Sequence, residues 1–116
     1  MEGKGIETAV ERGHFVRAAL MAEQADLSRD EIQGLRYKAI WQMAAEYRNV
    51  HGTKRLALRY GLSREDVRKI LEDFSQRAEK ENSKVLDPCY DYITGRHIPF
   101  GEWLAGFMKL WKKLPA

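Results

Sequence analysis

The stretch TKRLALRYGLSREDVRKILE, residues 53–72, decides the fold. Its apolar residues recur at intervals of three and four, the spacing that places side chains on one face of a helix. Gly61 interrupts this spacing, and glycine tolerates the positive φ that a tight turn between helices requires. Ser63 then begins a capping box, in which its hydroxyl accepts from the amide of Asp66 while the Asp66 carboxylate accepts from the Ser63 amide. The stretch therefore predicts two helices joined at Gly61.

The same stretch carries the side chains that a close crossing of two helices requires. Ala57 is small enough to lie where the helices touch, and Val67 and Ile70 are spaced to face the rest of the domain. Leu56, Tyr60 and Leu62 complete that apolar side. This pattern resembles the helix-turn-helix superfamily of DNA-binding proteins over residues 53–72. The resemblance implies that the second helix enters the major groove of double-stranded DNA.

The resemblance assigns roles to the side chains that this packing leaves outside. Arg64 and Arg68 suit the two acceptors of guanine, and Glu65 suits the amino group of cytosine. The expected base-contacting residues are Ser63, Arg64, Glu65, Arg68 and Lys69. The expected phosphate-contacting residues, which would set the register on the duplex, are Arg48, Lys54, Arg55 and Arg59.

The distribution of charge favours a polyanionic partner. The formal net charge of +3 says little by itself. Residues 48–69, however, hold a run of basic side chains opposed only by Glu65 and Asp66. The plain alternative for each of these charges is a solvated helix face.

Helical spacing continues towards the N-terminus. Residues 6–24 predict a first helix that Gly13 weakens. A capping box at Ser28 begins the next helix, which we expect to run from Arg29 to about Asn49 and to end at His51-Gly52. This helix is apolar on two sides, so it requires neighbours on two sides, within the domain or from a second subunit.

The C-terminal third contains one further helix. Turn signals at Asp87-Pro88 and Thr94-Gly95 predict an irregular connection. From about residue 99 to 114 an amphipathic helix carries the aromatic residues Trp103, Phe107 and Trp111. Alternation typical of strands is nearly absent. We therefore expect one all-α domain over residues 1–116, with about five helices and a central helix-turn-helix.

The order of these elements resembles the Trp repressor-like fold, in which a long helix leads through a turn into the helix-turn-helix. Members of that family are often intertwined dimers, so the resemblance implies a homodimer built on the helix from Arg29 to about Asn49 and on the last helix. The two arginines that hold the corepressor in the Trp repressor fall near Lys38 and Lys69. Lysine lacks the planar fork that binds a carboxylate, so we do not predict tryptophan sensing. We expect no cofactor.

Several classes of protein receive no support from the sequence. The single Cys89 excludes an intramolecular disulfide and has no partner at metal-ligand spacing. His14, His51 and His97 are scattered, and phosphate-loop and metalloprotease motifs are missing, which predicts neither an enzyme nor a metal site. No apolar run has the length of a membrane span, and the N-terminus is polar where a signal peptide would be apolar, which predicts a cytoplasmic protein.

Two functions remain. The first is sequence-specific binding of double-stranded DNA by a dimeric transcriptional regulator, whose small-molecule effector, if one exists, the sequence does not name. The alternative is a protein interaction module, in which the paired helices serve only for packing and the stripe Trp103, Phe107 and Trp111 docks into a partner or pairs with a second copy. A position of this stripe within the core requires no partner and is the expectation we favour.

Overall fold

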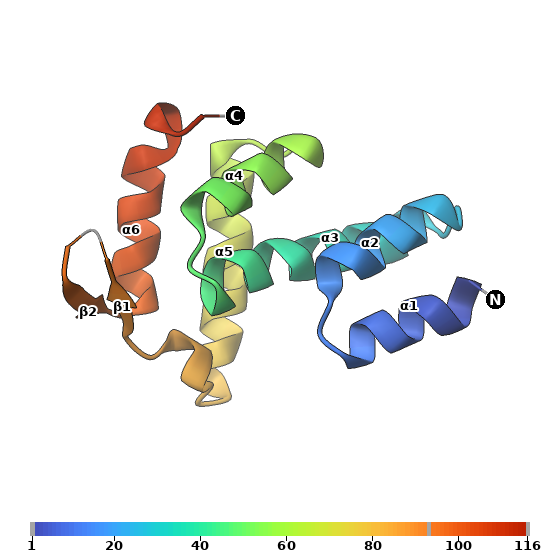
Figure 1. Ribbon diagram of the computed structural model, residues 1–116, viewed down its shortest axis with the longest axis horizontal. Coiled ribbons are helices and arrows are strands. Elements are labelled where there is room, and N and C mark those ends of the chain that lie inside the picture. Colours follow the sequence, from blue (N-terminus) through green and yellow to red (C-terminus); the bar gives the residue numbers. More distant parts are fainter. Residues whose placement is uncertain (1, 93, 116) are drawn as a thin grey trace.

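Six α-helices make up most of the molecule, as the computed structural model in Figure 1 shows for residues 2–92 and 94–115. The expected all-α class is therefore confirmed in outline, with a two-stranded hairpin in addition. The elements are α1 (Glu2–Glu11), α2 (Phe15–Gln24), α3 (Arg29–Trp41), the π-helical segment η1 (Gln42–Glu46), α4 (Val50–Arg59), α5 (Arg64–Lys80), the short 3-10 helix η2 (Lys84–Leu86), β1 (Cys89–Asp91), β2 (Arg96–Ile98), α6 (Phe100–Leu110) and the 3-10 turn η3 (Trp111–Lys113).

The N-terminal layer contains three helices that run back and forth beside one another (Figure 1). The single helix expected over residues 6–24 is divided at Gly13, which adopts a φ of 73°. Chain reversal there packs α1 and α2 together. Ala18, Ala19 and Ala22 are completely buried, and such small side chains let α2 lie close against its neighbours.

The helix α3 ends at Trp41, earlier than the end near Asn49 that its apolar pattern indicates. Its hydrogen bonding changes from α to π at Gln42, and the chain then turns at Arg48, a non-glycine residue with a φ of 49°. The expectation that His51-Gly52 ends this helix is wrong, because both residues lie in α4. The cap of α4 is Asn49, whose side-chain oxygen accepts from the Gly52 amide at 2.8 Å.

The helices α4 and α5 form the expected pair joined at Gly61, although each is longer than residues 53–72 indicate. Gly61 has a φ of 73°, and the next amide, that of Leu62, donates to the Ala57 carbonyl at 2.8 Å. Ala57 is fully buried between the helices. Both hydrogen bonds of the predicted Ser63–Asp66 capping box are present, at 3.1 and 2.9 Å.

The main core lies where α3, α4, α5 and α6 meet. Trp41 stacks on Phe74 of α5, with ring centroids 5.5 Å apart, and meets the edge of Phe100 of α6 at 5.1 Å. Along α6, Trp103, Phe107 and Trp111 are all buried. The aromatic stripe is therefore part of the core, as the sequence favoured, and its side chains are already covered within the chain.

A short hairpin stands in the connection before α6. Its strands are antiparallel, with Tyr90 opposite His97. The turn is fixed by Asp91, whose carboxylate accepts from the Thr94 amide at 3.1 Å and from the Thr94 hydroxyl at 2.7 Å. Strands of three residues are too short to show alternation, so only the turn signal at Thr94-Gly95 announced this hairpin.

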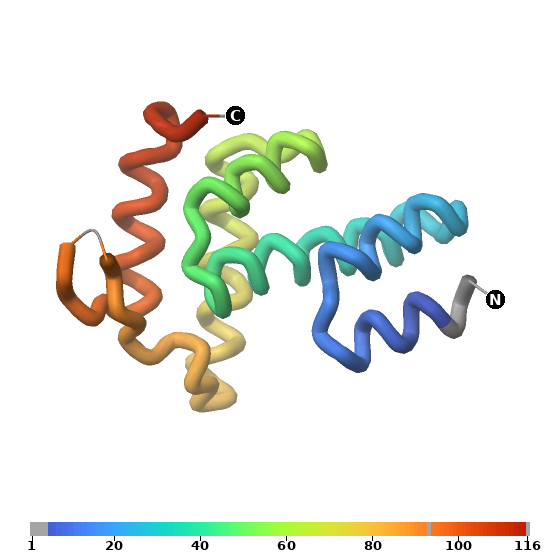
Figure 2. The backbone as a smooth tube through the Cα atoms, viewed as in Figure 1, coloured from blue at the N-terminus to red at the C-terminus, as the bar shows by residue number. Residues whose placement is uncertain are grey.

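The molecule is elongated, with extents of 46 × 31 × 22 Å. Figure 2 shows why: α1, α2 and the first part of α3 project to one side of the group formed by α4, α5, α6 and the hairpin. None of the helices in the described part of the chain combines the length and apolarity that crossing a bilayer requires.

We expect Ala57→Leu to lower the free energy of unfolding by about 1–3 kcal/mol, because the crossing of α4 and α5 leaves no room for extra methylene groups. The matched control is Arg55→Leu, which adds the same side chain on the exposed side of α4 and should change stability by less than about 0.5 kcal/mol. Urea denaturation of both variants measures the difference. Equal losses in the two variants would contradict the tight crossing.

Candidate functional site

The first two turns of α5 present a polar face to solvent. Val67, Ile70 and Leu71 are turned into the core, which leaves the opposite side of the helix outside. The predicted base-contacting residues all lie on this outer side. Ser63, Arg64, Glu65 and Lys69 are exposed, and Arg68 is half-buried. The structure thus brings the five residues together on one accessible surface.

Two carboxylates hold Arg68 in place on this surface. Its Nη1 donates to both oxygens of Glu72, at 2.8 and 2.9 Å, and its Nε donates to Glu65 Oε2 at 3.1 Å. These hydrogen bonds raise the pKa of Arg68, and the hydrogen bond from Arg68 lowers the pKa of Glu65. Ion pairs that water reaches are weak, so the Arg68 side chain is pre-positioned along the helix but still exchangeable.

Arg64 is anchored differently, because it reaches across to α6. Its Nε donates to the Met108 carbonyl at 3.0 Å, one of the last carbonyls of that helix. In the part of the chain that the structure describes, this is the one hydrogen bond of the Arg64 side chain. The outer edge of the guanidinium therefore keeps its two-nitrogen fork, the group that suits guanine.

Lys54 does not reach the surface, so its prediction as a phosphate contact is wrong. Its side chain is buried, with 8% of the residue exposed. The ammonium donates to the carbonyls of Trp111 at 2.5 Å and Leu114 at 2.6 Å, and lies 5.4 Å from the centroid of the Trp111 ring. Lys54 therefore satisfies the C-terminal carbonyls of the last helix and ties that end to α4.

Arg48 is likewise a structural residue, and its prediction as a phosphate contact is also wrong. Its guanidinium donates to backbone carbonyls of four residues: Ala45, Val85, Asp87 and Ile98. It also lies over the ring of Phe100, at 5.3 Å from the centroid. Burial lowers the pKa of Arg48, although a guanidinium remains charged at neutral pH.

Of the four predicted phosphate contacts, Arg55 and Arg59 remain on the surface. Both are exposed on α4. The sequence interpretation missed three further cations next to this surface, which are Lys109, Lys112 and Lys113. They are exposed at the end of α6 and in η3, close to the carbonyls that Arg64 and Lys54 bind. Figure 1 shows this end of the chain beside the start of α5.

The outer surface of α5 has no excess of positive charge. Its sequence REDVRKILEDFSQRAEK holds five basic and five acidic side chains. The positive excess therefore comes from the flanks, namely from α4 and from the lysines at the end of α6. The signal for this arrangement in the sequence was the triplet of late lysines, which also complements the dipole of the last helix.

We expect Lys54→Met to lower the free energy of unfolding by roughly 1–3 kcal/mol, because two helix-end carbonyls lose a charged donor. Arg55→Met, one residue further along α4 and exposed, should change it by less than about 0.5 kcal/mol. Thermal or urea denaturation distinguishes the two variants. A Lys54 variant as stable as the Arg55 variant would argue against the buried cap.

Comparison with known proteins does not identify a family for this chain. No model of a protein family matches the chain, and neither a characterised protein nor a solved structure is significantly similar to it.

Proposed function

We propose that this chain is a sequence-specific double-stranded DNA-binding protein, a transcriptional regulator that acts as a homodimer in the cytoplasm and not an enzyme. The observation that carries the proposal is the tight pair α4–α5. Three features of this pair are typical of a helix-turn-helix, in which the second helix is exposed to DNA. Ala57 is buried where the helices cross, Gly61 has a positive φ in the turn, and Ser63 caps the second helix.

The exposed polar groups support the same function. Lys69 and the fork of Arg64 lie on the outer side of α5, where a helix in the major groove presents its side chains to base edges. Arg55 and Arg59 on α4, with Lys112 and Lys113 beyond α6, flank that helix as phosphate contacts would. Because α5 itself is balanced in charge, we expect discrimination between sequences to come from hydrogen-bond geometry and affinity to come from the flanks.

The homodimer and the Trp repressor-like arrangement belong to the proposal through resemblance. The two apolar sides of α3 already have neighbours within the chain, since Ala39 and Ile40 are buried in the core while Ala18 and Ala22 of α2 are buried in the N-terminal layer. The apolar sides of α3 therefore do not demand a second subunit. Analytical ultracentrifugation, with and without the selected DNA, measures the oligomeric state directly.

We expect selection from a random duplex pool to enrich one sequence, with half-sites about 34 Å apart if two copies bind. Arg64→Ala should then cost roughly 1–3 kcal/mol of binding free energy and relax the preference at one base pair. The matched control is Lys80→Ala, which removes an exposed charge at the far end of the same helix. Retention of DNA by the protein without enrichment of any sequence would indicate non-specific binding and contradict the specific binding proposed. Failure to retain DNA even at low salt would refute DNA binding.

We expect Arg55→Ala to weaken binding to all duplexes alike and to reduce the salt dependence of the binding constant by about one unit, because it removes one phosphate contact. Binding to the selected and to a scrambled duplex at several salt concentrations provides the measurement. An effect of Arg55→Ala confined to the selected sequence would contradict its assignment to the phosphates.

A further inference from the structure

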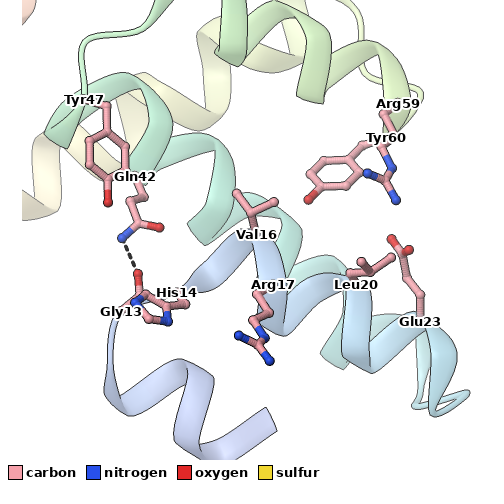
Figure 3. Close-up of a pocket in the computed structure, with 10 residues that line it drawn as sticks. All are labelled: Gly13, His14, Val16, Arg17, Leu20, Glu23, Gln42, Tyr47, Arg59 and Tyr60. Carbon is pink, nitrogen blue, oxygen red and sulfur yellow. Dashed lines mark hydrogen bonds between the residues drawn. The ribbon is translucent and has the colours of Figure 1, made fainter. Parts of the chain in front are cut away.

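A cleft lies between α2, the end of η1 and the C-terminal end of α4 (Figure 3). Its volume is about 350 Å³. Clefts that bind small molecules have volumes from about 300 to 1,000 Å³, so this one suits a small ligand. It stands apart from the outer face of α5, because its lining comes from the N-terminal layer, from the η1 region and from Arg59 and Tyr60 of the helix-turn-helix.

The walls of the cleft are mainly apolar and aromatic. Val16 and Leu20 of α2 form one wall, while the rings of Tyr47 and Tyr60 stand at either end in Figure 3. Leu20 is 37% exposed and Tyr47 62% exposed, large fractions for such side chains. Apolar surface gathered in a concave site favours an occupant that covers it with an apolar body.

The polar groups of the cleft that have no partner are cationic or neutral. Within residues 5–92 and 94–115, neither the hydroxyls of Tyr47 and Tyr60 nor the guanidinium of Arg59 has a hydrogen-bond partner. Figure 3 shows the Tyr60 hydroxyl directed into the cleft, with Arg59 beside it and facing the carboxylate of Glu23. Burial, and next the charge of Glu23, raise the pKa of Tyr60, so its hydroxyl remains a donor at neutral pH.

The charge of Glu23, the one lining carboxylate in the described part of the chain, is already compensated. Its Oε1 accepts from Arg36 Nη2 at 2.6 Å and from Arg36 Nε at 2.9 Å. Arg59 stands at the rim beside Glu23 and forms no ion pair in that same part of the structure, whereas the Arg17 side chain points away from the cleft, towards α1, in Figure 3. Arg36 and Arg59 together outnumber the single carboxylate of Glu23 at this end of the cleft, so the charge that complements it is negative.

The back of the cleft is held in place before any ligand enters. Gln42, the first residue of η1, is buried and donates from Nε2 to the Gly13 carbonyl, while its Oε1 accepts from the Phe15 amide at 3.4 Å. It thereby fixes the loop between α1 and α2 against η1. Short π-helical segments are rare and frequently lie at functional sites, and here the segment contributes directly to the lining.

We propose that this cleft binds a small planar aromatic anion. The aromatic body lies on Val16 and Leu20 between the two tyrosine rings, and the anionic group faces Arg59 and the Tyr60 hydroxyl. Stacking on tyrosine and a charge-assisted hydrogen bond to a guanidinium supply the affinity. This site goes beyond the proposed DNA binding and does not depend on it, although the two share Arg59, which is also one of the proposed phosphate contacts.

The first experiment titrates the full chain, without DNA, with 8-anilinonaphthalene-1-sulfonate, an aromatic sulfonate whose fluorescence increases on apolar surfaces. We expect saturable binding of one molecule per chain. The neutral probe N-phenyl-1-naphthylamine has the same aromatic body without the sulfonate, and we expect it to bind at least about tenfold more weakly. Equal affinity of the two probes, or no saturable binding of the sulfonate, would overturn the proposal.

Matched variants locate the site. We expect Arg59→Met to weaken binding of the sulfonate about tenfold or more, and Leu20→Trp to abolish it by filling the cleft. Lys80→Met on α5 and Leu58→Trp on α4 make the same kinds of change at exposed positions outside the cleft, and should leave the affinity within about twofold. Circular dichroism confirms that each variant is folded. Control variants that lose as much affinity as the cleft variants would place the probe elsewhere.

Discussion

The arrangement of the helices depends on the hydrogen bonds that the guanidinium of Arg48 donates to backbone carbonyls. This guanidinium donates to Ala45 at the end of η1, to Val85 and Asp87 in the connection after α5, and to Ile98 at the end of the hairpin. The residue itself occupies the left-handed region, which is uncommon for arginine and here begins the turn into α4. One half-buried cation therefore decides both where α4 starts and where the chain returns to begin α6.

Lys54 and Arg48 together fix the two ends of α6. Arg48 holds the start of α6, and Lys54 holds its end by donating to Trp111 and Leu114. With α6 fixed at both ends, the Met108 carbonyl is in reach of Arg64 on the first turn of α5. The accessible face of α5 is thus oriented by the hydrogen bonds of three cations and not by the core residues of α5. Arg64 belongs to α5, whereas Arg48 and Lys54 lie outside it.

Local features of the sequence predicted local structure well. Gly61, Ala57 and the Ser63–Asp66 box act within a few residues of one another, so their effect on the α4–α5 turn could be inferred without knowing the rest of the fold. Arg48 and Lys54 were misassigned because all their partners except Ala45 lie 37 to 60 residues away, and a sequence shows that a side chain is basic but not that it donates to carbonyls elsewhere in the fold. The change to π hydrogen bonding at Gln42 has no pattern of its own, since its apolar spacing is that of the preceding helix. The cleft could not be inferred at all, because its lining comes from three separate segments.

The alanine packing of the N-terminal layer has a consequence for the native ensemble. Detachment of α2 would expose little apolar area at Ala18, Ala19 and Ala22, because their side chains are small. Opening the aromatic core around Phe100 and Phe107 would expose far more apolar area. The layer of α1 and α2 is therefore the cooperative unit of lowest local stability, and its amides should exchange with deuterium through sub-global openings that leave α4–α6 folded. In those open states the Val16–Leu20 wall departs and the cleft ceases to exist. Any occupant of the cleft would thus act as a clamp that slows exchange in α2 first.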